Sequence, residues 1–506
     1  MRRKACLIHL LLVLVLLSAC TTSRRPGNDA ALRDIDAFVT RTLRTLPELP
    51  SVGLTIVEDG KVYTRGYGYA DLEHRIAAGP DTGYYNGSNT KAYTATVVAT
   101  LAAEGVLDLD APITKYLPEV QFAASIDASR LTLRRFLSHM SGIRNEAITF
   151  RTAYAGNHTP EELVRILGRS AAAKDEFYYD NLGYVVAGLV IERLTGRKWQ
   201  DVLDQRLFHP LNMRNTTTSM SVARKRPIAV PYAMNDRGVL ARLEYGWKDN
   251  SMMHAAGGIV TTPNDLARWL SANLTDGRIG SRQLLPASAF QETRRQQTPV
   301  KGGSPLFAHT GYGFGWYQST WRGTPLLFHG GGFEGWRSFS SFIPERRLAI
   351  GVMTNSSLGN APLEMISAYA YGRLAGLPDV DATYDKRIAE VRARFDRIAT
   401  NIVAEVNKRA QRAWTLTHPR SAYVGRYEGP TYGTLTIEER GDRLVASIGH
   451  LSSELQPYTN PESARVELIP GNGEILQFQF SSGAGADAVK WRDEVMVRSP
   501  SAANVQ

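Results

Sequence analysis

Hydrophobic residues alternate at both ends of the larger part of the chain and follow a helical period between those ends. Val52, Leu54 and Ile56 alternate with other residues, and Asp59-Gly60 then provides a turn into a second strand over 62–69, the pattern of a β-hairpin. Closely joined runs favour antiparallel pairing, so we predict an α+β fold, with an antiparallel sheet flanked by helices and joined to an all-α lobe. Further strands are expected at 313–318, 325–329, 336–343 and 348–354, and helices at 31–46, 89–104, 182–195 and 360–375.

The same pattern predicts how the chain divides. Of its 506 residues, 43% are apolar and 21% charged, which is typical of globular proteins and excludes a disordered or collagen-like chain. We expect an α+β domain over 31–378, a charged helical linker over 379–418 and a small C-terminal all-β, barrel-like domain over 419–506.

The N-terminal sequence is typical of an export signal. Three basic residues precede an apolar run over 7–17, and Leu17-Ser18-Ala19-Cys20 follows. This tetrad resembles the lipobox of bacterial lipoproteins, in which the cysteine carries lipid. We therefore predict a signal peptide over 1–19, a lipid on Cys20 that tethers the protein to a membrane, a flexible tether over 20–30 and a periplasmic location in the bacterial cell envelope, at the outer membrane. A plain signal peptide is the alternative. With Cys6 removed and Cys20 lipidated, cysteine catalysis, cysteine-bound zinc and disulfides are excluded.

Several other classes of function lack support in the sequence. The net charge is +10, but Arg224-Lys225-Arg226 is the one local basic cluster, and no aromatic stripe accompanies it, so nucleic acid is not an expected partner. The sequence contains no His-x-His-x-Asp, His-Glu-x-x-His or Gly-x-Ser-x-Gly motif. We expect no metal and no organic cofactor, and the sequence leaves the oligomeric state open.

Ser88-Asn89-Thr90-Lys91 is the strongest candidate for catalytic chemistry. At a spacing of three in a helix, the serine and the lysine lie on one face, one turn apart. A serine hydroxyl needs a base to take its proton, and a lysine on an apolar face can lose its charge and become that base. The alternative is a surface helix cap, and about one such motif is expected by chance in a chain of this length.

Two further motifs follow along the chain. Tyr179-Asp180-Asn181 is a Tyr-x-Asn motif, although Tyr84-Tyr85-Asn86 and Tyr458-Thr459-Asn460 fit the same pattern. His329-Gly330-Gly331-Gly332 comes at the end of one predicted strand and before another. His309-Thr310-Gly311 is a rival, which we expect to lie too far ahead of the strands to flank a central cleft.

In this order, Ser-x-x-Lys, Tyr-x-Asn and His-x-Gly resemble the serine β-lactamase and penicillin-binding protein superfamily, in particular its class C and carboxypeptidase- or esterase-like branch. The resemblance spans about residues 35–375 and includes the connecting phrases at 105–110, 137–142, 256–259 and 312–316. The C-terminal part resembles the small β domain often appended to such hydrolases.

The resemblance implies a role for each motif. Ser88 is the nucleophile that forms an acyl-enzyme, Lys91 accepts or relays its proton, and Tyr179 passes a proton to the leaving group. Asn181 holds the substrate amide. The backbone N–H groups of Ser88 and Gly332 form the oxyanion hole, where glycine permits close approach.

The third motif departs from many family members, and with it the substrate stays open. Many members that process β-lactams or D-Ala-D-Ala carry lysine where His329 stands before Gly331 and Gly332. Imidazole is largely neutral at pH 7, so a fixed charge for a substrate carboxylate is missing. An ester, an amide or peptide, and a β-lactam all remain candidate substrates. Alternatives to this enzyme are a penicillin-binding carboxypeptidase or D-aminopeptidase, and a non-catalytic ligand-binding lipoprotein.

Overall fold

The computed structural model describes residues 28–481, 483 and 485–500. The predicted signal peptide, Cys20 and the first residues of the predicted tether lie outside this part. The tether was predicted to reach residue 30, but α1 (Asn28–Thr45) already begins at Asn28, with Asp29 in its first turn, where a negative charge stabilises a helix. In the described part of the chain, no helix combines the length and the apolar character needed to cross a bilayer.

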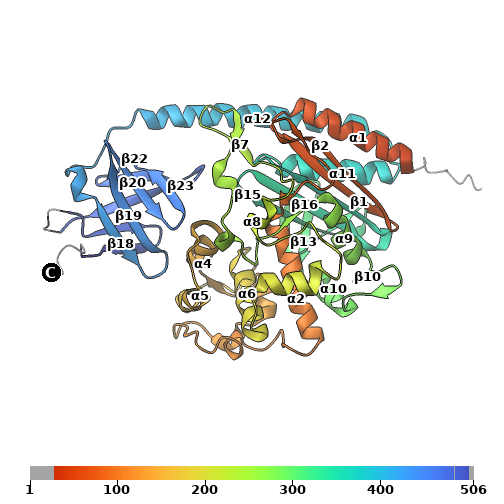
Figure 1. The fold of residues 1–506 in the computed structure, drawn as a ribbon, viewed down its shortest axis with the longest axis horizontal. Helices are drawn as coiled ribbons and strands as arrows, with labels where there is room; N and C mark the ends of the chain where they lie inside the picture. The colour runs from red at the N-terminus through yellow and green to blue at the C-terminus, as the bar shows by residue number, and fades with distance from the viewer. Residues whose placement is uncertain (1–27, 482, 484, 501–506) are drawn as a thin grey trace, which may run out of the picture.

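A nine-stranded antiparallel sheet organises the larger part of the molecule (Figure 1). The chain places its N-terminal hairpin in this sheet beside the strands that come some 250 residues later: β1 pairs with both β2 and β17, in register at Ile56 opposite Ile350. The prediction of an antiparallel sheet built from both ends of the domain is confirmed. Its strands, in spatial order, are β12 (Thr298–Gly303), β13 (Ala308–Tyr312), β14 (Tyr317–Trp321), β15 (Thr324–Phe333), β16 (Trp336–Ile343), β17 (Leu348–Thr354), β1 (Ser51–Glu58), β2 (Lys61–Asp71) and β3 (Ile76–Ala77).

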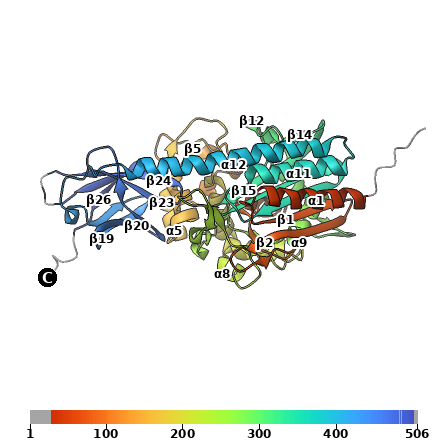
Figure 2. The ribbon, with the colours of Figure 1, turned by 90° about the horizontal axis from the view of Figure 1, so that it is seen from above.

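Helices cover both faces of the sheet. On one face, Val52, Leu54 and Ile56 of β1 pack with apolar residues of α1 and of α11 (Asn360–Leu374), which lie side by side in Figure 2. On the other face, α9 (Pro263–Leu274) packs so closely that a Cβ atom at Gly351 would lie 2.4 Å from the Leu266 side chain. Burial on both faces explains why almost all of β1 is buried rather than alternate residues alone.

The helical lobe lies between the two groups of strands in the sequence. Its central pair is α2 (Thr90–Ala103) and α6 (Leu182–Thr195), both rich in small and apolar residues and both buried along most of their length. The predicted helices at 89–104 and 182–195 are thus confirmed. The other helices of this region are α3 (Leu133–Leu137), α4 (Glu146–Phe150), α5 (Pro160–Leu167), α7 (Trp199–Leu203), α8 (Met220–Ala223) and α10 (Ala287–Arg294).

A long helix, α12 (Val380–Ala410), leads from this body to a second β structure (Figure 1). Near its middle it packs on the body, where Arg392 donates two hydrogen bonds to Glu48 and Phe395 is buried against Leu46 and Leu49. The C-terminal strands form a curved sheet whose edges approach each other, as Ser453 on β21 accepts a hydrogen bond from the backbone of Glu467 on β23 at 2.8 Å. The predicted barrel-like domain is present. In spatial order its strands are β21 (Leu451–Glu454), β20 (Arg443–Ile448), β19 (Gly433–Arg440), β18 (Gly425–Gly429), β26 (Glu494–Arg498), β25 (Ala488–Trp491), β24 (Asn472–Gln479), β23 (Ser463–Ile469) and β22 (Gln456–Pro457).

Two predicted strands are wrong in extent. Residues 313–316 form the turn between β13 and β14 and not the start of a strand, because Gly315 adopts φ +76° and packs against the backbone of Ala92 in α2. The strand predicted to end at His329 continues to Phe333, because β16 pairs with β15 along its whole glycine run.

Close helix packing generates a first prediction. A Cβ atom at Gly183 in α6 would lie 2.2 Å from the carbonyl oxygen of Phe136, and backbone cannot yield as a flexible side chain does. Gly183→Ala should therefore lower the free energy of unfolding by about 1–3 kcal/mol. Thermal unfolding measures this, with Gly79→Ala, which meets nothing within 4 Å, as the control. Equal midpoints for the two variants would contradict the packing argument.

Candidate active site

Ser88 occupies a single exposed position in a buried segment. It lies in the 3₁₀ turn η1 (Gly87–Asn89), directly before α2, so the helix begins one residue later than predicted, and the serine precedes it. Every residue from Thr82 to Leu101 is buried except Ser88, which is partly exposed. The fold therefore presents this hydroxyl, and no other side chain of the segment, to a ligand.

The turn η1 is pressed against the glycine run of β15. Gly87 has φ +52°, and a Cβ atom there would lie 2.3 Å from the backbone nitrogen of Gly332. Asn89 donates a hydrogen bond to Ser338 Oγ on β16 at 2.8 Å, and Ser338 donates one to the carbonyl of Asn86 at 2.7 Å. The turn that carries Ser88 and the strands β15 and β16, which are distant in the sequence, are thereby held together.

One edge of β15 is open at this point. β14 pairs with β15 only as far as Phe328, so from His329 to Phe333 the strand pairs with β16 alone. A strand edge without a partner presents backbone N–H and C=O groups. Here that edge lies next to Ser88, which is where an oxyanion hole would be needed.

Lys91 lies in the first turn of α2, completely buried, and its amine meets three oxygen atoms. Nζ is 3.2 Å from Ser88 Oγ, 2.7 Å from Asn181 Oδ1 and 3.1 Å from the carbonyl oxygen of Ala256. A charged ammonium donates to all three. A neutral amine donates two bonds and can turn its lone pair toward the serine hydroxyl.

Burial makes the neutral form accessible. Removal from water lowers the pKa of Lys91 to about 7, against a smaller opposite effect from the charge of Asp180. At neutral pH a substantial fraction of the amine is therefore unprotonated. A base within hydrogen-bonding distance of a serine hydroxyl is the arrangement that activates such a nucleophile.

Tyr179 and Asn181 come from the loop that ends at the start of α6. The Tyr179 ring lies with its centroid 4.9 Å from Lys91 Nζ, and its hydroxyl also hydrogen-bonds Ser88. Burial of this hydroxyl raises the pKa of Tyr179 well above 10, and the hydrogen bond to Ser88 acts in the opposite direction. Ser88, Lys91, Tyr179 and Asn181 are thus brought together, although 93 positions separate the first from the last.

His329 is buried in β15 and belongs to a chain of hydrogen bonds. Its Nδ1 bonds to the carbonyl of Gly330 at 2.6 Å, and its Nε2 lies 3.4 Å from the hydroxyl of Tyr312. That hydroxyl is also 3.3 Å from Nε2 of His139, whose Nδ1 accepts a bond from the backbone of Asp180. Burial lowers the pKa of His329 to about 3, with a further contribution from Lys91, so the imidazole is neutral.

His309 lies closer to the site than expected. β13 places its imidazole in a stack with Tyr317, 4.1 Å between centroids, and Tyr317 in turn stacks on Tyr179 at 6.1 Å. His329 is the histidine followed by the glycines that touch η1, whereas His309 belongs to the aromatic wall. The structure thus separates two histidines that the sequence pattern left as rivals.

Several residues at the site carry no sequence signal. The carbonyl of Ala256 holds Lys91 through the backbone, and Tyr312 links two buried histidines. Both occur in phrases noted for the family resemblance, but nothing in their side chains marks these contacts. Asp180, between the two residues of the Tyr-x-Asn motif, affects the pKa of Lys91 through its charge.

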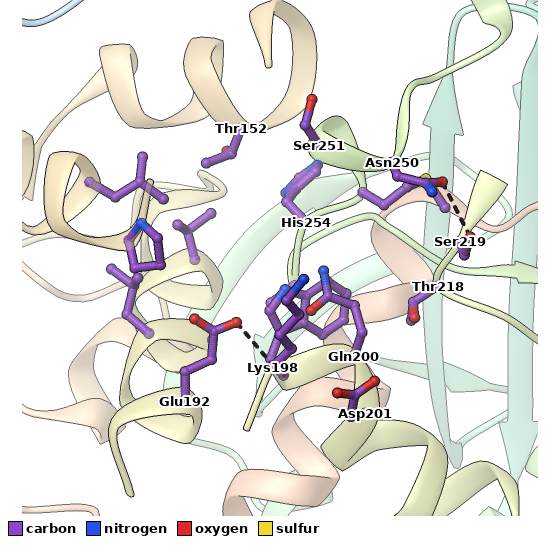
Figure 3. Close-up of a pocket in the computed structure, with 18 of the residues that line it drawn as sticks. Thr152, Glu192, Lys198, Gln200, Asp201, Thr218, Ser219, Asn250, Ser251 and His254 are labelled. Atoms are coloured by element: carbon purple, nitrogen blue, oxygen red, sulfur yellow. Dashed lines mark hydrogen bonds between the residues drawn. The ribbon is translucent and has the colours of Figure 1, made fainter. Parts of the chain in front are cut away.

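Two cavities adjoin this region. One, of about 270 Å³, is lined by Tyr179 and Asn181, by residues of the lobe and by Arg492 of the C-terminal barrel. The other, of about 600 Å³, is bordered by α6 and is lined by His254, Glu192 and Lys198 among others (Figure 3). It holds none of the predicted site residues, whereas the first is lined by Tyr179 and Asn181, although not by Ser88 or Lys91. Among the described residues, no group of three His, Cys, Asp or Glu side chains could hold a metal ion.

Comparison with known proteins decides the family. The model of the β-lactamase family matches residues 39–371. The chain belongs to the β-lactamase family. It is a serine hydrolase, in agreement with the resemblance of its three motifs.

Proteins similar to this chain include a penicillin-binding protein and a hydrolase. Penicillin-binding protein 4 of Amycolatopsis lactamdurans is 28% identical over 349 residues, 67% of this chain and 90% of the relative. The unguisins hydrolase ungD' of Aspergillus campestris is 25% identical over 419 residues, 78% of this chain and 76% of the relative. The latter alignment is longer than the family match itself.

Solved structures share the fold. The octameric penicillin-binding protein homologue from Pyrococcus abyssi has a TM-score of 0.59 and 22% identity, covering 92% of this chain and 100% of the other. The D-amino acid amidase from Ochrobactrum anthropi SV3 has a TM-score of 0.58 and 23% identity, covering 68% and 99%. Since only 8% of this chain lies outside the first alignment, that alignment includes at least part of the C-terminal barrel.

The electrostatics of Lys91 predict a pH dependence. The rate of covalent labelling of Ser88 by a fluorophosphonate should rise with pH through about 7, as the amine loses its proton. Because the charge of Asp180 raises the pKa of Lys91, Asp180→Asn should move this rise to lower pH. Asp175→Asn, which removes an exposed carboxylate of the same loop region, should leave it in place. A rise that stays fixed in Asp180→Asn would show that Lys91 is not the titrating base.

Proposed function

We propose that this β-lactamase family member hydrolyses amide bonds of small peptides or of D-amino-acid amides, through an acyl-enzyme on Ser88. The observation that supports this most strongly is the 3.2 Å contact between Ser88 Oγ and the Lys91 amine, whose pKa is about 7. The names of relatives and structural neighbours, which include a D-amino acid amidase, point to amides over esters and β-lactams.

In the acylation step, the neutral Lys91 amine takes the proton of Ser88 as Oγ attacks the substrate carbonyl carbon. The C–O bond forms while the carbonyl π electrons move onto its oxygen. Tyr179 then gives its proton to the leaving nitrogen as the C–N bond breaks, and it regains a proton from Lys91. Its raised pKa keeps the phenol protonated until that moment.

The oxyanion requires hydrogen-bond donors, and we assign these to the backbone N–H groups of Ser88 and Gly332. The close approach of Gly87 to the nitrogen of Gly332 supports this assignment. A side chain at Gly331 would collide with the carbonyl of Asn86, 2.1 Å from its Cβ, so glycine is required there for η1 and β15 to meet. Asn181, already bound to Lys91, orients the substrate amide.

Deacylation reverses the proton transfers. Water takes the place of the leaving amine, loses a proton toward Tyr179 and Lys91, and attacks the ester carbon. The Oγ–C bond breaks, and Ser88 recovers its proton from Lys91. The products are a carboxylic acid and the free enzyme, so no metal or organic cofactor enters the balance.

The envelope location rests on the N-terminal sequence. We propose that lipid on Cys20 anchors the hydrolase at the periplasmic face of the bacterial outer membrane. Arg2, Arg3 and Lys4 before an apolar run support export.

The decisive experiment is covalent labelling. Wild-type protein should be tagged by a fluorophosphonate or a fluorescent penicillin, and Ser88→Ala should not. Lys91→Ala and Tyr179→Phe should each slow acylation at least ~10²-fold, the usual scale for a positioned acid–base group. Relative rates on a D-amino-acid p-nitroanilide, a p-nitrophenyl ester and nitrocefin then rank the substrate classes.

The outcomes separate the alternatives. Preference for the anilide supports an amidase, whereas preference for nitrocefin would make the protein a β-lactamase. A folded wild-type protein that neither probe labels would favour a non-catalytic ligand-binding lipoprotein.

A further inference from the structure

The C-terminal barrel packs against the helical lobe that carries Tyr179. Phe150, at the end of α4, packs edge-on against Tyr432 and Trp491 of the barrel, with ring centroids 5.6 and 5.2 Å away. Arg151 donates a hydrogen bond to the carbonyl of Tyr432 at 3.2 Å, and the backbone of His450 donates one to Ala155 at 2.9 Å. The barrel therefore contributes to the surroundings of the active site.

One barrel residue lines the cavity that borders the active site at Tyr179 and Asn181. Arg492, in the turn between β25 and β26, lines the 270 Å³ cavity together with Tyr179 and Asn181. No other lining residue comes from beyond α12. A positive side chain from a separate domain is thus placed next to the group that we assign to leaving-group protonation.

The Arg492 guanidinium is held in place by its neighbours. It forms an ion pair with Glu474, and its central carbon lies 4.6 Å from the ring centroid of Phe150, 4.9 Å from that of Trp491 and 5.4 Å from that of Tyr432. Glu474 occupies Nε and one terminal nitrogen, whereas an arginine has five N–H donors. A fixed guanidinium with unused donors is suited to bind an anion with little loss of side-chain entropy.

A second guanidinium lines the same cavity from the lobe. Arg144 stacks on the ring of Tyr178 at 3.6 Å and donates one hydrogen bond, to the carbonyl of Ile143 at 3.1 Å. No ion pair of Arg144 with a carboxylate occurs in the described part of the chain. Its charge is therefore available to a ligand.

The acidic residues of the cavity are Glu146 and Asp180. The carboxylate of Asp180 faces inward, 3.7 Å from His139 Nδ1, and its charge acts on Lys91. Glu146 lies at the first position of α4, where a negative charge stabilises the helix. Neither neutralises Arg144.

We propose that this cavity binds the free carboxylate of the substrate's leaving residue, between Arg144 of the lobe and Arg492 of the C-terminal barrel. The proposal rests on the proposed amide hydrolysis and specifies its substrate as a short peptide with an unblocked C-terminus. Because His329 is neutral, the third motif has no positive charge. The two arginines provide positive charge at the wall of the cavity that the lobe and the barrel form. The barrel is then a specificity element of the active site.

The test compares N-acetyl-D-alanyl-D-alanine with its C-terminal amide. Wild-type enzyme should prefer the free acid by at least about tenfold in kcat/KM. Arg144→Gln and Arg492→Lys should each reduce that preference about tenfold, the first by removing charge and the second by removing the planar fork. Exposed arginines serve as controls, with Arg169→Gln in the lobe and Arg426→Gln in the barrel, and both should behave as wild type.

Folding and function are checked separately. Because Arg492 packs among aromatic rings, each variant is tested by thermal unfolding and by fluorophosphonate labelling, which needs no carboxylate. Arg144 stacks near the surface, so its variant carries the test if Arg492→Lys unfolds. An unchanged acid-to-amide ratio in a folded, labelled Arg144→Gln would overturn the proposal.

A binding measurement keeps the two proposals distinguishable. Calorimetric titration of Ser88→Ala with the acid and the amide measures recognition without turnover. Tighter binding of the acid, lost in Ser88→Ala combined with Arg144→Gln, supports the carboxylate site even if wild type fails to label. Equal binding of acid and amide refutes the site even if labelling succeeds.

Discussion

The chemistry of this site depends on how the Lys91 amine is buried. A buried ammonium is strongly disfavoured unless a counter-ion compensates it, and an adjacent carboxylate would restore its charge. The three atoms that meet this amine are a hydroxyl, an amide oxygen and a backbone carbonyl, all of them neutral. They satisfy its hydrogen bonds without pairing its charge. The fold can therefore enclose the amine and still leave its pKa near 7.

Those contacts require three remote segments to meet above one helix. Asn181 begins α6, Ala256 lies in the approach to β9 (Val260–Thr261), and the glycines of β15 close the other side of the serine. The sheet makes this arrangement rigid, because β1 is buried on both faces and pairs with β17 and β2. Ser88 sits where lobe and sheet adjoin, so small shifts of either would alter the distance from Oγ to Nζ.

Local patterns predicted the helices, the hairpin and the three motifs, because each depends on neighbours in the sequence. The errors lie where tertiary contacts override the pattern. Gly315 lies in a run whose alternating pattern predicts a strand. In the structure it adopts φ +76° in a turn that packs against α2. The role of Ala256 is a backbone contact, and that of Arg492 depends on how the barrel docks on Phe150. No local signal encodes either, since both require the assembled fold.

The neutral third motif and the arginines of the opposite wall form one electrostatic arrangement. The charge of Lys91 contributes to the lowered pKa of His329, so a permanent charge from a lysine at position 329 would in turn depress the pKa of the base. A cation is better tolerated farther away, beyond Tyr179 and the loop of Asp180. Arg144 and Arg492 occupy that position, with the carboxylate of Asp180 on the side of the base. Recognition of an anionic group and activation of Ser88 can then coexist, because the charges that serve one act weakly on the other.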